Sequence, residues 1–428
     1  MGKRFITLDN GLRVLLDRRK DALSVYVTLA VNVGAFFPQS QKIGLAHVLE
    51  HNICNNNSEE IFNKVGTTLE AFTYDYNTIY AVRTFKEHLN LVFNTLFETV
   101  FDALFSKEFF NSEKKVIKEE YKKQRANVMG QNAFKAAESF YEGTFISGSG
   151  YGIGNSKQVD AITYDDVVGF YNEYYGLNNS VLVVTGNFNE NDCLKKIKAL
   201  CKKFAKTAKT DVKMVKNDIN LDISHKINVL SSGKDQTCST EIMFSAARED
   251  DEDFYTYKCL SYMFCGMFSH SVVRDRLRRK LAIVYECDAD VDGNIPYKDC
   301  GTLSIRYYVA NQNVIRSIVE TFKAVCSLLK EKNQTVLDIA KTCLVNDTKM
   351  KCENLFASTL LQVSSLVTSS KVFDVFKVEK QIKSITHEDI CLALKNILSK
   401  KIVVSVLGTK VDASAIKKEL KEIIQEVV

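Results

Sequence analysis

A short pattern that occurs twice places the strongest limit on how this chain folds. Residues 180–186 read Ser-Val-Leu-Val-Val-Thr-Gly before a helical pattern, and residues 402–408 read Ile-Val-Val-Ser-Val-Leu-Gly before another one. The two glycines lie about half the chain apart, so we predict two similar domains, residues 1–205 and 223–428, that arose by duplication. The Lys- and Asp-rich, glycine-free stretch 206–222 would join them. Chance recurrence is the alternative, because strand–helix units are common.

The pattern around this repeat predicts an α+β fold. Residues 5–8 and 12–16 alternate on either side of Asp9-Asn10-Gly11, which is typical of a hairpin, and residues 24–31 form an apolar run typical of a central strand. Apolar spacing of three and four favours helices from Ile43 to about Ala71 and from Glu87 to about Gly130. We therefore expect each domain to contain an antiparallel sheet covered by helices.

Composition excludes several classes of protein. Hydrophobic residues make up 46% of the chain and charged residues 25%, as in globular domains. The net charge of +5 is too small for a nucleic-acid surface, so we expect no nucleic-acid partner. No apolar stretch reaches the ~18 residues of a membrane span, and the N-terminus reads as strand and turn instead of a signal segment. The 12 cysteines show no CxxC spacing, so we expect reduced thiols and a cytoplasmic protein.

Two of the six histidines are four residues apart with a glutamate between them, in the sequence His-Val-Leu-Glu-His at 47–51. On a helix, His47, Glu50 and His51 share one face, so both imidazoles can reach one metal ion while the carboxylate lies beside it. This is the H-x-x-E-H arrangement of inverse zincins. Satisfied core histidines are the alternative, but burying a glutamate on the same apolar face would be costly without a metal.

These features resemble the M16 metallopeptidases, the family of insulin-degrading enzyme, pitrilysin and mitochondrial processing peptidase. The resemblance spans essentially the whole chain, from the N-terminal hairpin and residues 44–51 to the repeated strand ends. It implies that family's metallohydrolase fold, Zn²⁺ as the cofactor, and a glutamate downstream as the third ligand. The implied ligand is Glu120, with Glu113 seven residues earlier as the residue that supports the site. Read alone, residues 113–120 are a solvated charged helix.

Residues 66–80 resemble the family's edge strand, to which an extended substrate adds through main-chain hydrogen bonds. The resemblance implies substrate-binding roles for Glu70, Ala71, Phe72 and Thr73. Glu70 stands where the family usually has asparagine, and it could change substrate preference or place a second carboxylate near the metal. Residues 52–57 also depart from the family's apolar, glycine-containing continuation. Both departures bear on substrate range more than on metal binding.

Residues 277–285 resemble the arginine and tyrosine, seven residues apart, with which the family holds the substrate backbone and polarises the carbonyl. The resemblance assigns these roles to Arg278, at the end of a helix begun near Ser271, and to Tyr285, on the strand after it. A basic helix surface is the alternative. No second H-x-x-E-H occurs at residues 253–264, where the repeat would place it. We therefore expect the second domain to be a catalytically silent copy.

The predicted function is zinc-dependent endopeptidase activity on peptides or unfolded segments. His47, His51 and Glu120 would hold Zn²⁺, and Glu50 would be the general base. Chains of this length in the family pair around a chamber, with the zinc domain of one chain facing the second domain of the other, so we expect a homodimer. The alternatives are a heterodimer with an M16 homologue that processes the leader of a specific bacteriocin-type precursor, and a non-catalytic structural homologue.

Overall fold

The computed structural model describes residues 2–37, 41–54, 58–149, 152–209, 221–268, 270–295, 297 and 299–428. The chain forms two compact units. Unit 1 comprises Met1–Tyr121, Ser149–Val215 and Met350–Phe373, and unit 2 comprises Lys122–Gly148, Lys216–Lys349 and Asp374–Val428. The halves 1–205 and 223–428 thus each supply most of one unit, and each gives one segment to the other unit. Most of the expected linker 206–222 lies outside the described residues.

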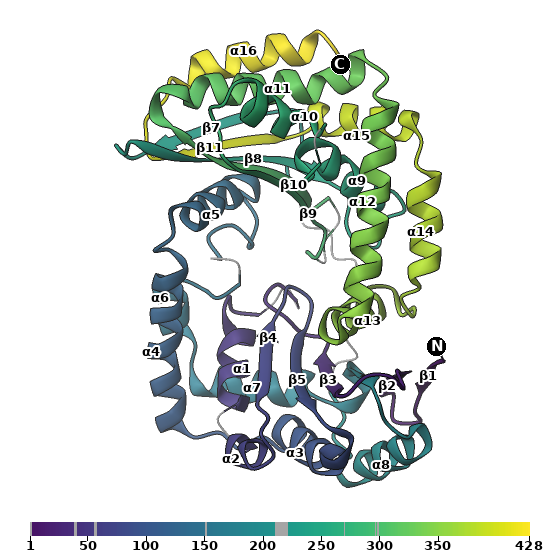
Figure 1. Ribbon diagram of the computed structural model, residues 1–428. Helices are drawn as coiled ribbons and strands as arrows, with labels where there is room; N and C mark the ends of the chain where they lie inside the picture. Colours follow the sequence, from purple (N-terminus) through teal and green to yellow (C-terminus); the bar gives the residue numbers. More distant parts are fainter. Residues whose placement is uncertain are drawn as a thin grey trace. The chain divides into compact units, whose positions relative to one another are not determined.

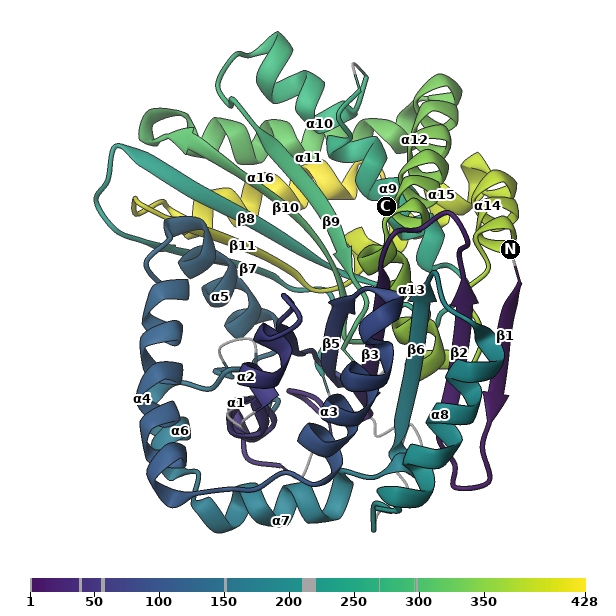
Figure 2. The same ribbon diagram turned by 60° about the horizontal axis from the view of Figure 1, so that its bottom comes forward.

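The sheet of unit 1 has six strands in the order β1-β2-β6-β3-β5-β4. Every neighbouring pair is antiparallel except β2 with β6, which is parallel. Figure 2 shows β3, β6, β2 and β1 side by side in this order. The predicted hairpin and central strand are confirmed as β1, β2 and β3. The strands are β1 (Lys3–Thr7), β2 (Arg13–Arg18), β3 (Val25–Val31), β4 (Leu69–Thr73), β5 (Thr78–Thr84) and β6 (Ser180–Gly186).

Helices pack on this sheet through one large apolar core that includes Val27, Leu29, Val48, Leu96 and Val184. Burial of such side chains from water is the main force that joins the helical layer to the strands. The helices of the first half in unit 1 are α1 (Leu45–Cys54), α2 (Ser58–Asn63), η1 (Lys86–His88), α3 (Leu89–Phe101), α4 (Lys107–Gln124), α6 (Ser156–Ala161), α7 (Tyr164–Tyr174), η2 (Leu177–Asn179) and α8 (Glu190–Lys203).

The expected helices were too long at both places. In the stretch expected to be helical as far as Ala71, the last helix ends at Asn63 and strand β4 begins at Leu69. Gly66 lies between them with a φ of 67°, a left-handed conformation that ends a helix. The stretch from Glu87 to Gly130 is divided among η1, α3, α4 and the start of a further helix.

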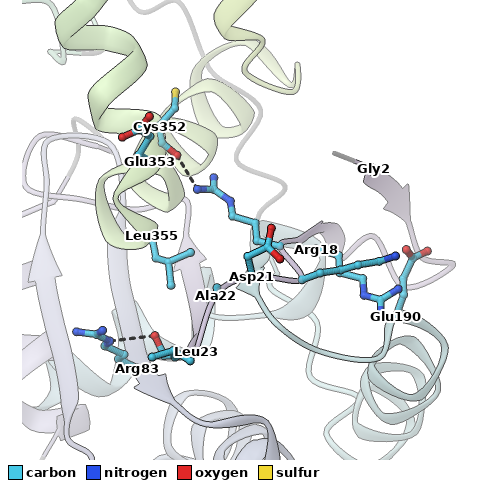
Figure 3. A pocket seen from close by; sticks show the side chains of 13 residues that line it. Gly2, Arg18, Asp21, Ala22, Leu23, Arg83, Glu190, Cys352, Glu353 and Leu355 are labelled. Atoms are coloured by element: carbon cyan, nitrogen blue, oxygen red, sulfur yellow. Dashed lines mark hydrogen bonds between the residues drawn. The ribbon is translucent and has the colours of Figure 1, made fainter.

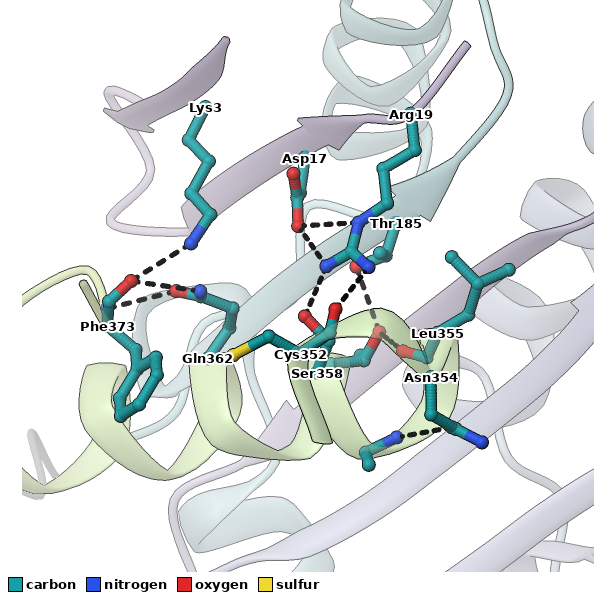
Figure 4. Close-up of polar contacts among 12 residues, drawn as sticks. Lys3, Asp17, Arg19, Thr185, Cys352, Asn354, Leu355, Ser358, Gln362 and Phe373 are labelled. Carbon is teal, nitrogen blue, oxygen red and sulfur yellow. Dashed lines mark hydrogen bonds and ion pairs between the residues drawn. The ribbon is translucent and has the colours of Figure 1, made fainter. Parts of the chain in front are cut away.

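A helix from the second half of the sequence, α13 (Leu355–Ser369), completes unit 1 and packs on the face of the sheet made by residues such as Ala30 and Val183. Polar contacts fix its start (Figure 4). The fully buried Asp17 accepts a hydrogen bond from Arg19 at 2.9 Å, and the same guanidinium donates to the Cys352 main-chain oxygen at 2.6 Å and to the Ser358 hydroxyl. Removing one partner of such a buried charged pair typically costs about 3–5 kcal/mol.

The sheet of unit 2 has five strands in the order β7-β11-β8-β10-β9. The β7–β11 pair is parallel, and the other pairs are antiparallel. This order matches β2-β6-β3-β5-β4 of unit 1 strand for strand, which supports the duplication. The strands are β7 (Ile227–Ser232), β8 (Thr237–Ala246), β9 (Cys287–Asp292), β10 (Gly301–Ala310) and β11 (Ile402–Leu407).

The glycine that ends each copy of the repeat has the same role in both units. Gly186 and Gly408 have φ values of 135° and 124°, and a Cβ on either would lie 2.2 Å from the Ser24 oxygen or 2.8 Å from the Thr237 oxygen. Each glycine therefore lets the chain leave a central strand against the start of its antiparallel neighbour, and no larger residue fits there. This close approach explains why the sequence pattern recurs.

Helix α5 (Val128–Phe140), from the first half of the sequence, lies on the sheet of unit 2 (Figure 1). Its fully buried Asn132 donates to the main-chain oxygens of Ser239 and Ser405 and accepts from the Ser405 hydroxyl at 2.7 Å. The other helices assigned mainly to unit 2 are α9 (Phe254–Cys265), α10 (Val272–Arg274), η3 (Asp275–Lys280), η4 (Asn311–Asn313), α11 (Val314–Lys330), α12 (Gln334–Glu353), α14 (Val375–Ser384), α15 (His387–Ser399) and α16 (Ala413–Gln425).

The overall architecture is α+β, with two similar units that each contain a helix-covered sheet. All cysteines are free thiols, and most of them are buried. Within the described ranges, no helix combines the length and the apolar character needed to cross a membrane.

Candidate metal centre

Helix α1 places the two histidines and the glutamate of the H-x-x-E-H motif on adjacent positions of one face. Val48, Leu49 and Ile53 are fully buried in the core of unit 1, so the orientation of the helix is fixed by apolar packing. His47 and His51 then stand one turn apart, with ring centroids 4.7 Å from each other. The motif predicted from the sequence is therefore held on a rigid element.

Helix α4 brings two carboxylates to these histidines. Glu113 Oε2 lies 2.8 Å from His51 Nδ1. Glu120, two turns later, places Oε2 at 3.6 Å from His47 Nε2 and at 3.7 Å from His51 Nε2. One ligand atom from each of His47, His51 and Glu120 lies within 4.8 Å of the others. The structure thus brings together all three predicted ligands and the predicted supporting residue.

The geometry of this cluster fits a zinc ion. Zinc bonds to nitrogen and oxygen of about 2.0–2.2 Å in a tetrahedron separate the ligand atoms by about 3.3–3.6 Å, close to the distances from Glu120 to the two imidazoles. Glu113 occupies Nδ1 of His51 and so leaves Nε2 directed at Glu120. Two imidazoles and one carboxylate are a donor set that suits zinc better than magnesium or calcium.

Burial and charge act in opposite directions on the two histidines. Burial, and then the neighbouring His51, lower the pKa of His47 to about 4. Burial also disfavours the charged form of His51, but the carboxylates of Glu120 and Glu113 outweigh it and raise the pKa of His51 to about 9. One cationic charge therefore faces several carboxylates, and the site is electrostatically suited to a cation.

Glu50 is buried beside this cluster and is held from the edge strand. The Thr73 hydroxyl, at the end of β4, donates to Glu50 Oε2 at 2.5 Å. Burial raises the pKa of Glu50, and the hydrogen bond from Thr73 opposes that shift. Sequence reasoning named Thr73 only as a substrate-binding residue. Nothing in the sequence pattern indicates this contact, because helix and strand are joined only by packing.

Strand β4 lies at the edge of its sheet and pairs with β5 on one side, as expected for the segment that resembles a substrate-binding strand. Side chains alternate along it, so Ala71 and Thr73 face α1 while Glu70 and Phe72 face the opposite side. Glu70 therefore does not share the face on which Thr73 meets Glu50. This placement favours a role in substrate preference over a second carboxylate at the metal. Asn55–Asn57 of the unusual segment after the motif lie outside the described residues.

Arg278 and Tyr285 belong to unit 2 and have a different local structure from the one expected. The helix that follows Ser271 continues as the π-helix η3, which contains Arg278, and Tyr285 lies two residues before β9 instead of on it. A positive φ of 53° at Ala282 turns the chain between them. The Arg278 guanidinium carbon lies 5.0 Å from the centre of the Tyr285 ring, which is 81% exposed. Both side chains therefore lie on one accessible segment.

Unit 1 also has a surface cavity, and its lining residues differ from those of the metal cluster. This cavity of about 900 Å³ is lined by residues such as Arg18, Arg83, Glu190 and Leu355 (Figure 3). None of the predicted site residues lines it, and it contains no histidine. Its lining mixes charged side chains of both signs with leucines and indicates no specific chemistry.

Two family descriptions match the chain in sequence order. "Insulinase (Peptidase family M16)" matches residues 13–139, which include the whole cluster, and "Peptidase M16 inactive domain" matches residues 161–344. Together they cover most of the chain. The protein belongs to the M16 peptidase family.

Relatives of known name agree with this assignment. An uncharacterised zinc protease of Rickettsia felis is 22% identical over 413 residues, which are 94% of this chain and 96% of that protein. The probable beta subunit of the mitochondrial processing peptidase of Arabidopsis thaliana is 23% identical over 73% of this chain and 60% of its own length. The structure of a peptidase M16 inactive domain from Pseudomonas fluorescens has a TM-score of 0.81 at 14% identity, over 96% of this chain and 99% of that one. That last likeness concerns the fold alone.

Proposed function

We propose that this protein is a zinc-dependent endopeptidase. The observation that carries the proposal is the cluster of His47, His51 and Glu120 with the buried Glu50 beside it. A structural homologue without catalysis would have no need to keep two imidazoles and three carboxylates together in a largely buried place, because desolvating them is costly. The names of the relatives as zinc proteases support the same reading.

In this proposal each group has one task. His47, His51 and Glu120 would hold zinc, which at such a site would supply a Lewis acid for the hydrolysis of a peptide bond. Glu50 would accept on a carboxylate oxygen the proton of the water that attacks the peptide carbonyl, and would return this proton to the leaving amine. Thr73 keeps the Glu50 carboxylate in place, and Glu113 orients the ring of His51. Arg278 and Tyr285 orient the peptide and stabilise developing negative charge.

The proposed assembly is a homodimer in which paired chains enclose the substrate. The chain carries both the zinc motif and the Arg278–Tyr285 segment, so one kind of chain can supply both parts of a shared site. A heterodimer with an M16 homologue, specialised for one precursor peptide, is the alternative. We place the protein in the cytoplasm, and its free cysteines support this.

Elemental analysis and a cleavage assay test the proposal together. Purified protein should contain about one zinc per chain and should cut a randomised peptide pool only while zinc is present. His47→Ala and Glu120→Ala should lose most of the zinc and the cleavage. Glu119→Gln, which changes the neighbouring carboxylate on α4, is the matched control and should keep both. A preparation that binds no zinc on reconstitution would contradict the proposal.

A further inference from the structure

Strand β4 pairs with β5 on one side, and its other side has no strand partner among the described residues. Tyr74 donates its amide to the Asn77 oxygen at 2.8 Å, and the register continues with Phe72 opposite Ile79 and Glu70 opposite Ala81. In an antiparallel pair, every second residue bonds to the partner strand, so the amides and carbonyls of Ala71 and Thr73 point away from β5. No other strand within the described ranges pairs with β4. An extended peptide can therefore add at this edge.

The face of β4 opposite to the metal cluster carries a carboxylate beside aromatic rings. Phe72 lies 6.0 Å from Phe356 and 6.2 Å from Tyr74 between ring centroids, and Tyr26 lies 5.4 Å from Phe356. Glu70 lies on the same face of β4 as Phe72 and is close enough to Tyr26 to contribute, after burial, to raising the pKa of its hydroxyl. We call Tyr26, Glu70, Phe72, Tyr74 and Phe356 the acidic aromatic face.

Among the residues that the structure describes, the Glu70 carboxylate forms no ion pair with a lysine or arginine. Arg83 lies beside the acidic aromatic face, with its guanidinium 5.9 Å from the centre of the Tyr26 ring, but its Nε donates to the Ser24 hydroxyl at 3.2 Å and it forms no ion pair with Glu70 among the described residues. A half-buried carboxylate next to aromatic rings is a favourable site for the cation of a lysine or arginine side chain.

We propose that Glu70 and the acidic aromatic face select substrates with a lysine or arginine at one fixed position of the segment that pairs with β4. This inference rests on the proposed peptidase function. A residue directly opposite Glu70 in an added strand would place its side chain about 4.5–5.5 Å away on the same face. An opposite charge there is stabilised, and a carboxylate is repelled.

The structure also fixes where this residue lies relative to the cut. Thr73 bonds to Glu50, so the end of β4 lies beside the proposed general base. Glu70 precedes Thr73 by three residues, about 10 Å along a strand. The selected basic residue should therefore stand about three residues from the cleaved bond, always on the same side of it.

Cleavage of a randomised peptide pool followed by mass spectrometry tests the selection. Wild-type products should be enriched in lysine or arginine at that single offset. For a matched set of peptides that differ only there, Glu70→Gln should lower kcat/KM for the lysine peptide by about tenfold and leave the glutamine peptide unchanged. Glu70→Lys should reverse the preference towards glutamate. Glu87→Gln, an exposed carboxylate just beyond β5, is the control and should behave as wild type.

A binding experiment separates this inference from the proposed function. The same peptides, labelled with a fluorophore, are titrated into Glu50→Gln protein and into Glu50→Gln combined with Glu70→Lys. A preference for lysine that Glu70→Lys reverses supports the acidic aromatic face even if wild-type protein cuts nothing, in which case only the peptidase proposal fails. Zinc-dependent cleavage without any basic preference, or a preference that survives Glu70→Lys, overturns the present inference alone.

Discussion

The two units place a helix against an edge strand at the same point of the same topology, but with different side chains. In unit 1, α1 follows β3 and precedes β4, and its Glu50 accepts a hydrogen bond from Thr73 of β4. In unit 2, α9 follows β8 and precedes β9, and its Lys258 donates to the carboxylate of Asp290 and the main-chain oxygen of Val291, each at 2.8 Å. The contact in unit 1 holds a carboxylate beside the candidate metal ligands, whereas the contact in unit 2 only joins a helix to the edge strand of its sheet.

This difference shows that the fold supplies a position and the side chains supply the chemistry. Helix α9 carries no histidine, and the alternating Asp288, Asp290 and Asp292 of β9 discourage another strand from pairing there. Strand β4 carries a single carboxylate and exposes Phe72. The two sheets therefore have equivalent edges, and among the described residues only the edge of unit 1 combines an open strand with candidate zinc ligands.

The largest effect should come from replacing Glu50 on α1, and the matched replacement of Lys258 on α9 is its control. Glu50→Gln keeps size and hydrogen bonding but accepts no proton, so turnover should fall by about a hundredfold or more while zinc is retained. Lys258→Gln, the matched change on α9, should leave turnover within about twofold and lower the free energy of unfolding by about 1 kcal/mol. Peptide turnover, zinc content and urea unfolding measure these effects. Unchanged turnover in Glu50→Gln would mean that another group is the base.

Mixing two inactive variants tests whether unit 1 of one chain and unit 2 of another chain form one active site. Glu50→Gln damages unit 1 and Tyr285→Phe damages unit 2, so a mixed homodimer would keep one intact site of two. With random pairing, half of the dimers are mixed, and activity should rise to about a quarter of the wild-type value. Light scattering gives the oligomeric state. A strictly monomeric protein, or proven exchange without recovery, would contradict the shared-site homodimer.

Removing the hydroxyl that links β4 to α1 should have an intermediate effect. Thr73→Val keeps the shape of the side chain but not its hydrogen bond to Glu50, and such bonds to a charged group contribute about 1.5–3 kcal/mol. We expect kcat to fall by at least about tenfold with little change in KM, whereas Thr73→Ser should keep most of the activity. Zinc content is the control and should stay constant. Equal losses in both variants would point to packing instead of positioning.

An effect on stability alone, without loss of turnover or zinc, should come from the ion pair that supports η3 in unit 2. Glu320 accepts from Arg276 Nε at 2.5 Å and from Lys323 at 3.2 Å. Burial alone would raise the pKa of Glu320, but these two cations hold it below its usual value of 4.5. Because the folded pKa is the lower one, the pair stabilises the fold at neutral pH and loses its effect as the pH falls below about 4.5.

Glu320→Gln tests this pair. It should lower the free energy of unfolding at pH 7 by about 1–2 kcal/mol and remove that part of the acid sensitivity. Urea unfolding at pH 7 and pH 4 measures both. Zinc content should not change, since the cluster belongs to unit 1. An unaltered pH profile would show that the pair contributes nothing to stability.

Local patterns predicted the elements of this fold well where the chain's own periodicity decides the structure. The hairpin of β1 and β2, the buried strand β3 and both strand–glycine–helix repeats follow from alternation and from glycine positions. The prediction that a helix reaches Ala71 was wrong, because apolar spacing alone does not show where a helix ends and an edge strand begins. The sequence likewise did not predict that α5 of the first half packs in unit 2 and α13 of the second half packs in unit 1, because the apolar face of a helix does not specify which sheet it covers.

The sequence by itself determined the metal motif, since His47, Glu50 and His51 are neighbours on any helix that contains them. It also determined that two copies of one pattern exist. Only the tertiary structure decided that Glu120 and Glu113 meet these histidines, that Thr73 holds Glu50, and that Glu70 faces away from them. The physical reason is separation along the chain. Spacing on one helix is a local property, whereas contacts between α1, α4 and β4 form only when the core of unit 1 packs these elements together.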